Sequence, residues 1–236
     1  ALDRALLAKL LQPSPSALPK IGATVLHDLD TKHILLSFDD PALADVVASR
    51  GWNGAIVAAD GADLALIDTS LSNGKLGPFL HKTATYQQSR AGLVTVRVSY
   101  TNHYVPVLGA PWDPFISGQY WDWRKQDYVR EQGDWLGYIR VLIPAASTLQ
   151  SAQGWDDQPV TTYDTPGFAT IGFPLLVRPG ATREVQLTYQ LPAAAASSSL
   201  EVIAQPGAAP YQIRPEFAGE SAQTGTVDGR NLLLAP

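Results

Sequence analysis

The sequence predicts a mainly β protein of the α+β class: a small strand–helix–strand–strand unit followed by an antiparallel β-sandwich. Apolar and polar residues alternate along several segments after Phe79, and Pro-Gly pairs separate some of these segments. Alternation with period two is typical of strands with one buried face, and Pro-Gly marks tight turns. We therefore expect a helix and proline-rich linker over 1–31, the small unit over 32–78 and the sandwich over 79–236.

The N-terminal segment combines leucines with prolines. Five leucines at helical spacing in residues 1–12 predict a short helix. Pro13, Pro15 and Pro19 then predict that this helix ends and a linker follows, because each proline removes an amide donor and restricts the preceding residue.

The small unit is expected to alternate strands with one helix. The apolar run 34–38 predicts a buried strand, and the segments 52–59 and 63–67 predict two more. Asp40 is suited to cap a helix and Pro41 to occupy its first position, so a helix is predicted between the first two strands. Because such a unit is too small to be stable alone, we expect it to pack on its neighbours.

The sandwich is predicted from its many short alternating segments. Turns of the Pro-Gly type are expected at 166–167, 179–180 and 206–207. Several short strands separated by such turns favour two packed sheets. The predicted strands are 80–87, 94–100, 139–143, 160–165, 168–177, 185–191, 200–205 and 211–217.

Composition excludes several function classes. The chain has 236 residues, of which 45% are hydrophobic, and a formal net charge of −5 without a dense basic cluster. Nucleic acid is therefore excluded as a partner. Cysteine is absent, which removes disulfides, thiolate nucleophiles and cysteine-based zinc sites. The four histidines have no zinc-ligand spacing, so we expect no metal and no cofactor.

The start of the chain bears on its origin. Residue 1 is Ala, and no apolar run approaches the roughly 20 residues that a membrane helix needs. We therefore expect a processed or excised piece of a larger protein, with any membrane anchor or signal peptide upstream.

The loop after the 63–67 strand contains the weak catalytic candidates Asp68, Ser70 and Lys75. A desolvated lysine can take the proton of a serine hydroxyl and so create a nucleophile. The alternative is a turn around Asn73 whose polar side chains satisfy loop amides, and we favour it because no recognisable triad spacing or oxyanion hole accompanies these residues.

A long aromatic loop is expected at 103–134. Aromatic rings among polar residues suit a sugar face or a protein partner, because they combine rigid apolar area with hydrogen-bonding tips. Self-packing of the loop over one end of the sandwich is the competing interpretation, and catalysis is a third. The candidate binding residues are Trp112, Tyr120, Trp121, Trp123, Tyr128 and Trp135, and Phe115 lies among them.

An ordered set of short motifs resembles the bacterial domain of unknown function 4012 family over about residues 30–215. The motifs are KHILL at 32–36, GWNG at 51–54, LID at 66–68, YTN at 100–102, YIRVLIP at 138–144, VRPG at 177–180, YQLP at 189–192 and VIAQPG at 202–207. Two positions depart from the family: Ser70 replaces an asparagine, and Gly77 an acidic residue after Lys75.

The resemblance implies an envelope protein with an N-terminal membrane helix, of which this chain would be the C-terminal half. Since the family has no assigned activity, we expect a non-enzymatic extracytoplasmic structural or interaction module. Its expected partners are an envelope protein or glycan, the upstream half of the same polypeptide, and a second copy of the chain. The alternatives are a hydrolase or transferase that acts on envelope glycans or peptides through the Asp68–Lys75 loop, and a subunit of a surface filament or layer.

Overall fold

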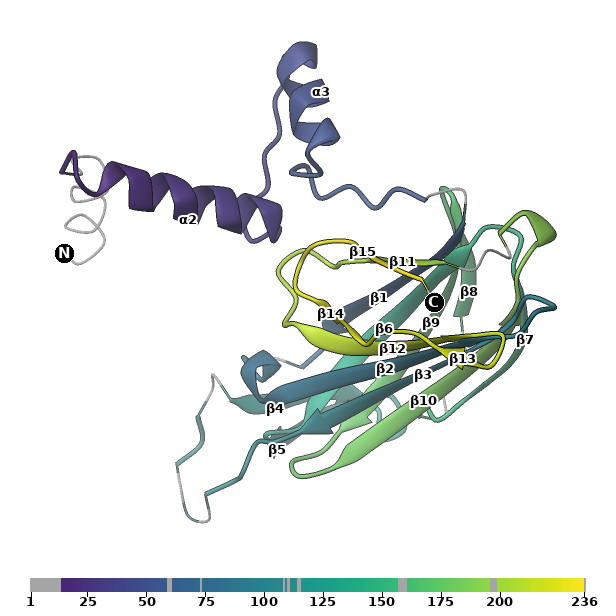
Figure 1. The fold of residues 1–236 in the computed structure, drawn as a ribbon. Helices are drawn as coiled ribbons and strands as arrows, with labels where there is room; N and C mark the ends of the chain where they lie inside the picture. The colour runs from purple at the N-terminus through teal and green to yellow at the C-terminus, as the bar shows by residue number, and fades with distance from the viewer. Residues whose placement is uncertain are drawn as a thin grey trace. The chain divides into compact units, whose positions relative to one another are not determined.

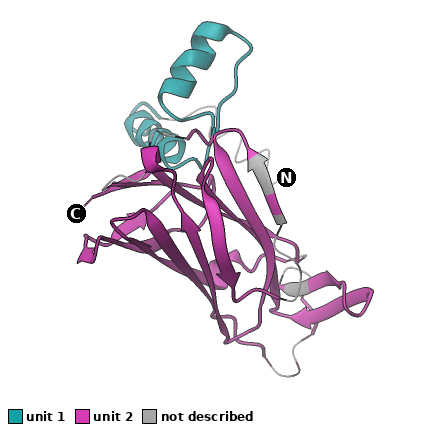
Figure 2. Ribbon diagram, turned by 90° about the vertical axis from the view of Figure 1, so that its right-hand side faces the viewer, with its two compact units in different colours: residues 1–55 teal, residues 56–236 magenta. Residues whose placement is uncertain are grey.

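A computed structural model describes residues 14–58, 61–72, 74–107, 109, 111–113, 116–156, 161–195 and 199–235. The chain divides into two compact units, residues 1–55 and 56–236 (Figure 2). No helix within the described ranges has the length and apolar character needed to cross a membrane. The helix predicted for residues 1–12 lies outside the described residues.

The first unit contains two helices. α2 spans Leu18–Asp30, and a proline, Pro19, lies in its first turn. A proline there starts a helix without losing a hydrogen bond, so the linker predicted for this segment is wrong. α3 spans Pro41–Ser49 as predicted, and the Asp40 carboxylate accepts hydrogen bonds from the amides of Ala42 and Leu43 at 2.9 and 3.1 Å.

Two of the strands predicted for the small unit are wrong. Residues 34–38 and the described part of 52–59 form no strand. One backbone hydrogen bond joins the two segments, from Leu36 N to Trp52 O at 2.9 Å, but no ladder continues it. Leu35 and Phe38 are also 47% and 43% exposed, so the apolar run is not a buried strand. The third predicted strand, β1 (Ala62–Ser70), belongs to the sandwich instead.

The second unit confirms the mainly β class: two sheets pack face to face (Figure 1). The first sheet has the order β15-β11-β1-β6-β9-β8, and the second β13-β12-β2-β3-β10-β7 with β14 beside β12. The first sheet contains β6 (Trp135–Pro144), β8 (Thr161–Thr165), β9 (Phe168–Val177), β11 (Leu200–Ile203) and β15 (Leu232–Leu234) together with β1. The second contains β2 (Leu80–Gln88), β3 (Leu93–Asn102), β7 (Thr148–Gln153), β10 (Thr182–Gln190), β12 (Tyr211–Phe217), β13 (Glu220–Ser221) and β14 (Gly225–Val227), and short 3-10 helices span Gly77–Phe79 and Ala193–Ala195.

Most strand pairs are antiparallel, as predicted, but two are parallel. β11 pairs with β1 and β12 pairs with β2 in parallel register. Parallel neighbours need a long crossover connection, and here each pair joins an early strand to one more than a hundred residues later. Local sequence patterns do not carry this information.

The core lies between the two sheets and is filled by the inward residues of the alternating strands. Its fully buried side chains include Leu64 of β1 and Phe173 of β9 from one sheet, with Tyr86 of β2 and Tyr189 of β10 from the other. The predicted Pro-Gly turns are present, since Gly167, Gly180 and Gly207 have φ angles of +81°, +71° and +67°. The alternation therefore identifies the core correctly.

The predicted aromatic loop contains a β-hairpin. β4 (Ser117–Asp122) and β5 (Asp127–Gln132) pair with each other in a separate two-stranded sheet. Most of the predicted candidate residues lie in two places, this hairpin and the C-terminal end of β1.

Candidate functional site

One buried amide side chain fixes both ends of the aromatic loop 103–134. Asn102, 1% exposed at the end of β3, donates from Nδ2 to the carbonyl oxygens of Gly133 at 2.7 Å and Val177 at 3.0 Å. Its Oδ1 accepts from the backbone amide of Tyr104 at 3.0 Å. A buried amide whose donors and acceptor are satisfied is costly to displace, so Asn102 holds the two ends of the loop that carries the hairpin in fixed positions.

The inner face of the hairpin packs on the outer face of the first sheet. Tyr120 of β4 and Val129 of β5 are buried against Leu136 of β6, and Trp123 is partly buried beside them. The Tyr120 hydroxyl donates to the Asp134 carboxylate at 3.2 Å. Burial raises the pKa of Asp134 above its ordinary value and that of Tyr120 as well. Self-packing therefore accounts for half of the hairpin's aromatic residues.

The outer face presents two rings to solvent. Trp121 and Tyr128 are directly paired across β4 and β5, and their centroids lie 5.2 Å apart in an edge-to-face arrangement. They are 44% and 59% exposed. Trp112, on the segment leading to the hairpin, is 43% exposed. Aromatic pairs of this geometry stabilise each other, so the two rings form a fixed apolar surface.

The predicted set of binding aromatics therefore divides. Trp121, Tyr128 and Trp112 are exposed, whereas Tyr120 is buried in the hairpin's own contact with the sheet. Trp135, the first residue of β6, is only 3% exposed. It is buried because it stacks on Tyr100 in the core, with ring centroids 5.7 Å apart. Trp135 is therefore not part of the exposed aromatic surface. Phe115 lies outside the described residues.

Asp68, the first weak catalytic candidate, joins the two sheets. Its Oδ2 lies 2.6 Å from Lys82 Nζ, and its Oδ1 accepts from the Tyr100 hydroxyl at 2.6 Å. The Asp68 and Lys82 side chains are 18% and 7% exposed, and Lys82 Nζ also lies 4.2 Å from the centroid of the Tyr211 ring. Burial, followed by the nearby Asp68 charge, raises the pKa of Tyr100. The carboxylate on β1 thus contacts β2 and β3 of the opposite sheet.

A glutamine fixes the backbone of the same residue. The Gln205 side chain accepts from Asp68 N at 2.7 Å and donates to Asp68 O at 2.9 Å, as a neighbouring strand would. A cavity of about 210 Å³ opens beside it, lined among others by Asp68, Ser70, Lys82 and Trp135. Ser70 Oγ donates to the Ser72 carbonyl oxygen at 3.1 Å, and Lys82 rather than Lys75 is the lysine that lines the cavity. Asn73 lies outside the described residues.

The sequence contained a signal for Lys82 that the predictions missed. On β2 the inward positions are Ala84 and Tyr86, and Lys82 has the same parity. A charge at an inward position requires a partner, since burying an unpaired charge is costly. An acidic partner could therefore have been inferred for Lys82, although the pattern does not identify it as Asp68. Within the described residues, no cluster of three or more histidine, aspartate or glutamate side chains could hold a metal ion.

Comparisons with known proteins give little further information. The sequence matches no known family profile and no curated protein. A two-domain M1 zinc metallopeptidase mutant bound to L-tryptophan is 14% identical over 69% of this chain and 44% of its own, with a TM-score of 0.25. An M1 zinc metallopeptidase mutant from Deinococcus radiodurans, bound to a Tyr-Ser-Ala substrate, is 12% identical over 66% and 41%, also with a TM-score of 0.25. The chain spans less than half of these structures, and such scores carry no functional argument.

Proposed function

We propose that this chain is a non-enzymatic, extracytoplasmic structural or interaction module of the cell envelope, and part of a larger membrane-anchored protein. It contacts an envelope protein or glycan through the Trp121–Tyr128 pair. The observation that supports this most is the exposure of two adjacent aromatic rings on a hairpin whose other face is buried. The resemblance of the motifs between residues 30 and 215 to an envelope family supports the location.

The physics of binding favours such a pair. Trp and Tyr are the residues that most often dominate the energy of an interface, because each removes a large area from water with few rotatable bonds. The two rings already pack on each other, and Tyr120 and Val129 anchor the strands beneath them. A preformed surface loses little conformational entropy on binding.

The Asp68 cluster fits a structural role better than catalysis. The Lys82 ammonium lies against the Asp68 carboxylate, and that carboxylate also accepts the Tyr100 hydroxyl. An ammonium has no lone pair, so Lys82 in this ion pair cannot accept the Ser70 proton. The cluster instead connects β1 with β2 and β3, so it stabilises the sandwich that carries the hairpin.

A pull-down from envelope extracts tests the proposal. Replacing both rings, Trp121→Ala with Tyr128→Ala, is expected to reduce retention of envelope material at least tenfold, since each ring contributes about 1–2 kcal/mol or more at an interface centre. The matched control is Leu233→Ala, which removes a 70% exposed side chain on β15. The control should bind as the unchanged protein does. Equal retention by the double variant and the control, with both folded, would refute the contact.

The hydrolase or transferase alternative can be tested at Ser70. Ser70 lines the cavity that also contains Asp68 and Lys82. If the alternative holds, Ser70→Ala abolishes turnover of envelope glycan or peptide fragments by the full chain. Our proposal expects no turnover by either protein, measured by mass spectrometry of the incubated fragments.

A further inference from the structure

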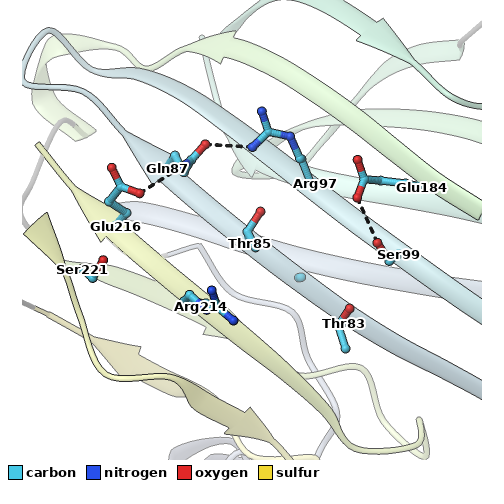
Figure 3. A pocket seen from close by; sticks show the side chains of 10 residues that line it. Thr83, Thr85, Gln87, Arg97, Ser99, Glu184, Arg214, Glu216 and Ser221 are labelled. Atoms are coloured by element: carbon cyan, nitrogen blue, oxygen red, sulfur yellow. Dashed lines mark hydrogen bonds between the residues drawn. The ribbon is translucent and has the colours of Figure 1, made fainter. Parts of the chain in front are cut away.

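A polar groove crosses the outer face of the second sheet, away from the hairpin and the Asp68 cavity. It has a volume of about 240 Å³ and is formed by side chains of β2, β3, β10, β12 and β13 (Figure 3). The proposed function does not use this face, and none of the sequence-predicted candidates lies on it.

The groove follows from the strand register. Arg214 of β12 is paired with Thr85 of β2, and Thr85 is paired with Arg97 of β3. A short side chain therefore lies between two long ones on the same face, as Figure 3 shows. The adjoining positions on this face, Thr83 and Ser99, are also short. The result is a depression with a guanidinium on each side.

Arg97 is held in place by two glutamines. Its Nε donates to Gln186 Oε1 at 2.8 Å and its Nη1 to Gln87 Oε1 at 2.9 Å. Gln87 in turn donates from Nε2 to Glu216 at 3.0 Å, so one chain of hydrogen bonds crosses four strands. A guanidinium fixed in this way is preorganised, because its rotamer entropy is already lost.

Two groups in the groove lack a partner among the described residues. Arg214 is exposed and makes no hydrogen bond or ion pair there. The Thr85 hydroxyl oxygen is shielded from solvent and has no hydrogen-bond partner. A buried hydroxyl without a partner is uncommon in native proteins, and here it lies beside the unpaired guanidinium. The exposed Arg214 guanidinium is therefore suited to an oxygen acceptor placed in the groove, and Thr85 forms the floor beneath it.

The charges and hydroxyls restrict the ligand. Glu184 and Glu216 balance Arg97 and Arg214, so a phosphate dianion would be repelled by two carboxylates. A planar carboxylate matches the guanidinium fork and carries a single charge. Glu184 accepts from Ser99 at 3.1 Å, and its remaining oxygen lone pairs suit hydroxyl donors. We propose that this groove binds an acidic saccharide, with the sugar carboxylate at Arg214 and Arg97 and its hydroxyl groups at Glu184 and Ser99.

NMR titration of the full ¹⁵N-labelled chain tests the assignment. Glucuronate is expected to shift the Arg97 and Arg214 Nε–Hε signals with a dissociation constant on the order of 1 mM, as for a small polar ligand. Glucose, which lacks the carboxylate, should bind at least roughly tenfold more weakly. Absence of a saturable shift, or equal binding of glucose, would overturn the proposal. Tighter binding of N-acetylglycine or of inorganic phosphate would overturn the saccharide assignment.

Paired variants separate the groove from surface charge in general. Arg214→Gln removes the unpaired guanidinium and should weaken glucuronate binding roughly tenfold. Arg230→Gln is the control, because Arg230 is also an exposed arginine but does not line the groove or belong to the hairpin. The control should leave binding unchanged. Equal weakening by the two variants would mean that glucuronate responds only to net charge.

Discussion

The ion pair between Lys82 and Asp68 provides a quantitative test of how the two sheets are joined. We expect Lys82→Met to lower the free energy of unfolding by about 3 kcal/mol, because methionine retains the apolar stem but leaves the Asp68 carboxylate buried without its cation. The value lies at the lower end of the range for buried pairs since the Asp68 side chain is 18% exposed and keeps the Tyr100 hydrogen bond.

Urea denaturation of the full chain, followed by tryptophan fluorescence, measures this loss. Lys125→Met is the matched control: Lys125 also faces an aspartate, Asp122, at 4.0 Å, but its side chain is 65% exposed. An exposed pair contributes little, so the control should change stability by less than about 0.5 kcal/mol. A loss below about 1 kcal/mol for Lys82→Met would show that the pair acts as a surface salt bridge and would refute the reasoning.

Two further predictions concern packing and pH. Gly137→Ala places a methyl group against the Trp135 indole and should lower the free energy of unfolding by about 1–3 kcal/mol. Gly77→Ala is the control and should cost less, because the space around Gly77 is open. Thermal denaturation of both variants measures the difference. Burial raises the pKa of Asp134, so its ionisation opposes folding as the pH rises from 3.8 through that higher pKa. Asp134→Asn, which can still accept from Tyr120, should therefore gain stability relative to the unchanged chain across that window in urea denaturation; a constant difference would contradict this.

The alternating strands were predictable because each one records its burial in its own residues. The bounds predicted for β9 and β12 agree with the structure, and those for β2 differ by one residue. The strands predicted at 34–38 and 52–59 were wrong because local composition does not show whether a segment has a neighbouring strand to pair with. Their apolar content alone suggested strands.

Side-chain direction in the candidate site was only partly predictable. Extending the β6 alternation back from Ile139 places Trp135 on the inward face, so its burial could have been inferred. The partner of Asp68 could not be inferred from spacing. Lys75 is closer in sequence, but Lys82 is brought to Asp68 by packing of β2 against β1 across the core. Chain separation says little about contacts between sheets.

The proposed function requires Trp121 and Tyr128 to be available to a partner while Tyr120 and Trp123 hold the hairpin against the sheet. ¹⁹F NMR of the chain labelled with fluorotryptophan reports each of its six indoles separately. On addition of envelope extract, we predict that the Trp121 signal shifts or broadens, while those of the buried Trp135 and the partly buried Trp123 stay unchanged. An unchanged Trp121 signal, or an equal change at all six positions, would contradict the proposed contact.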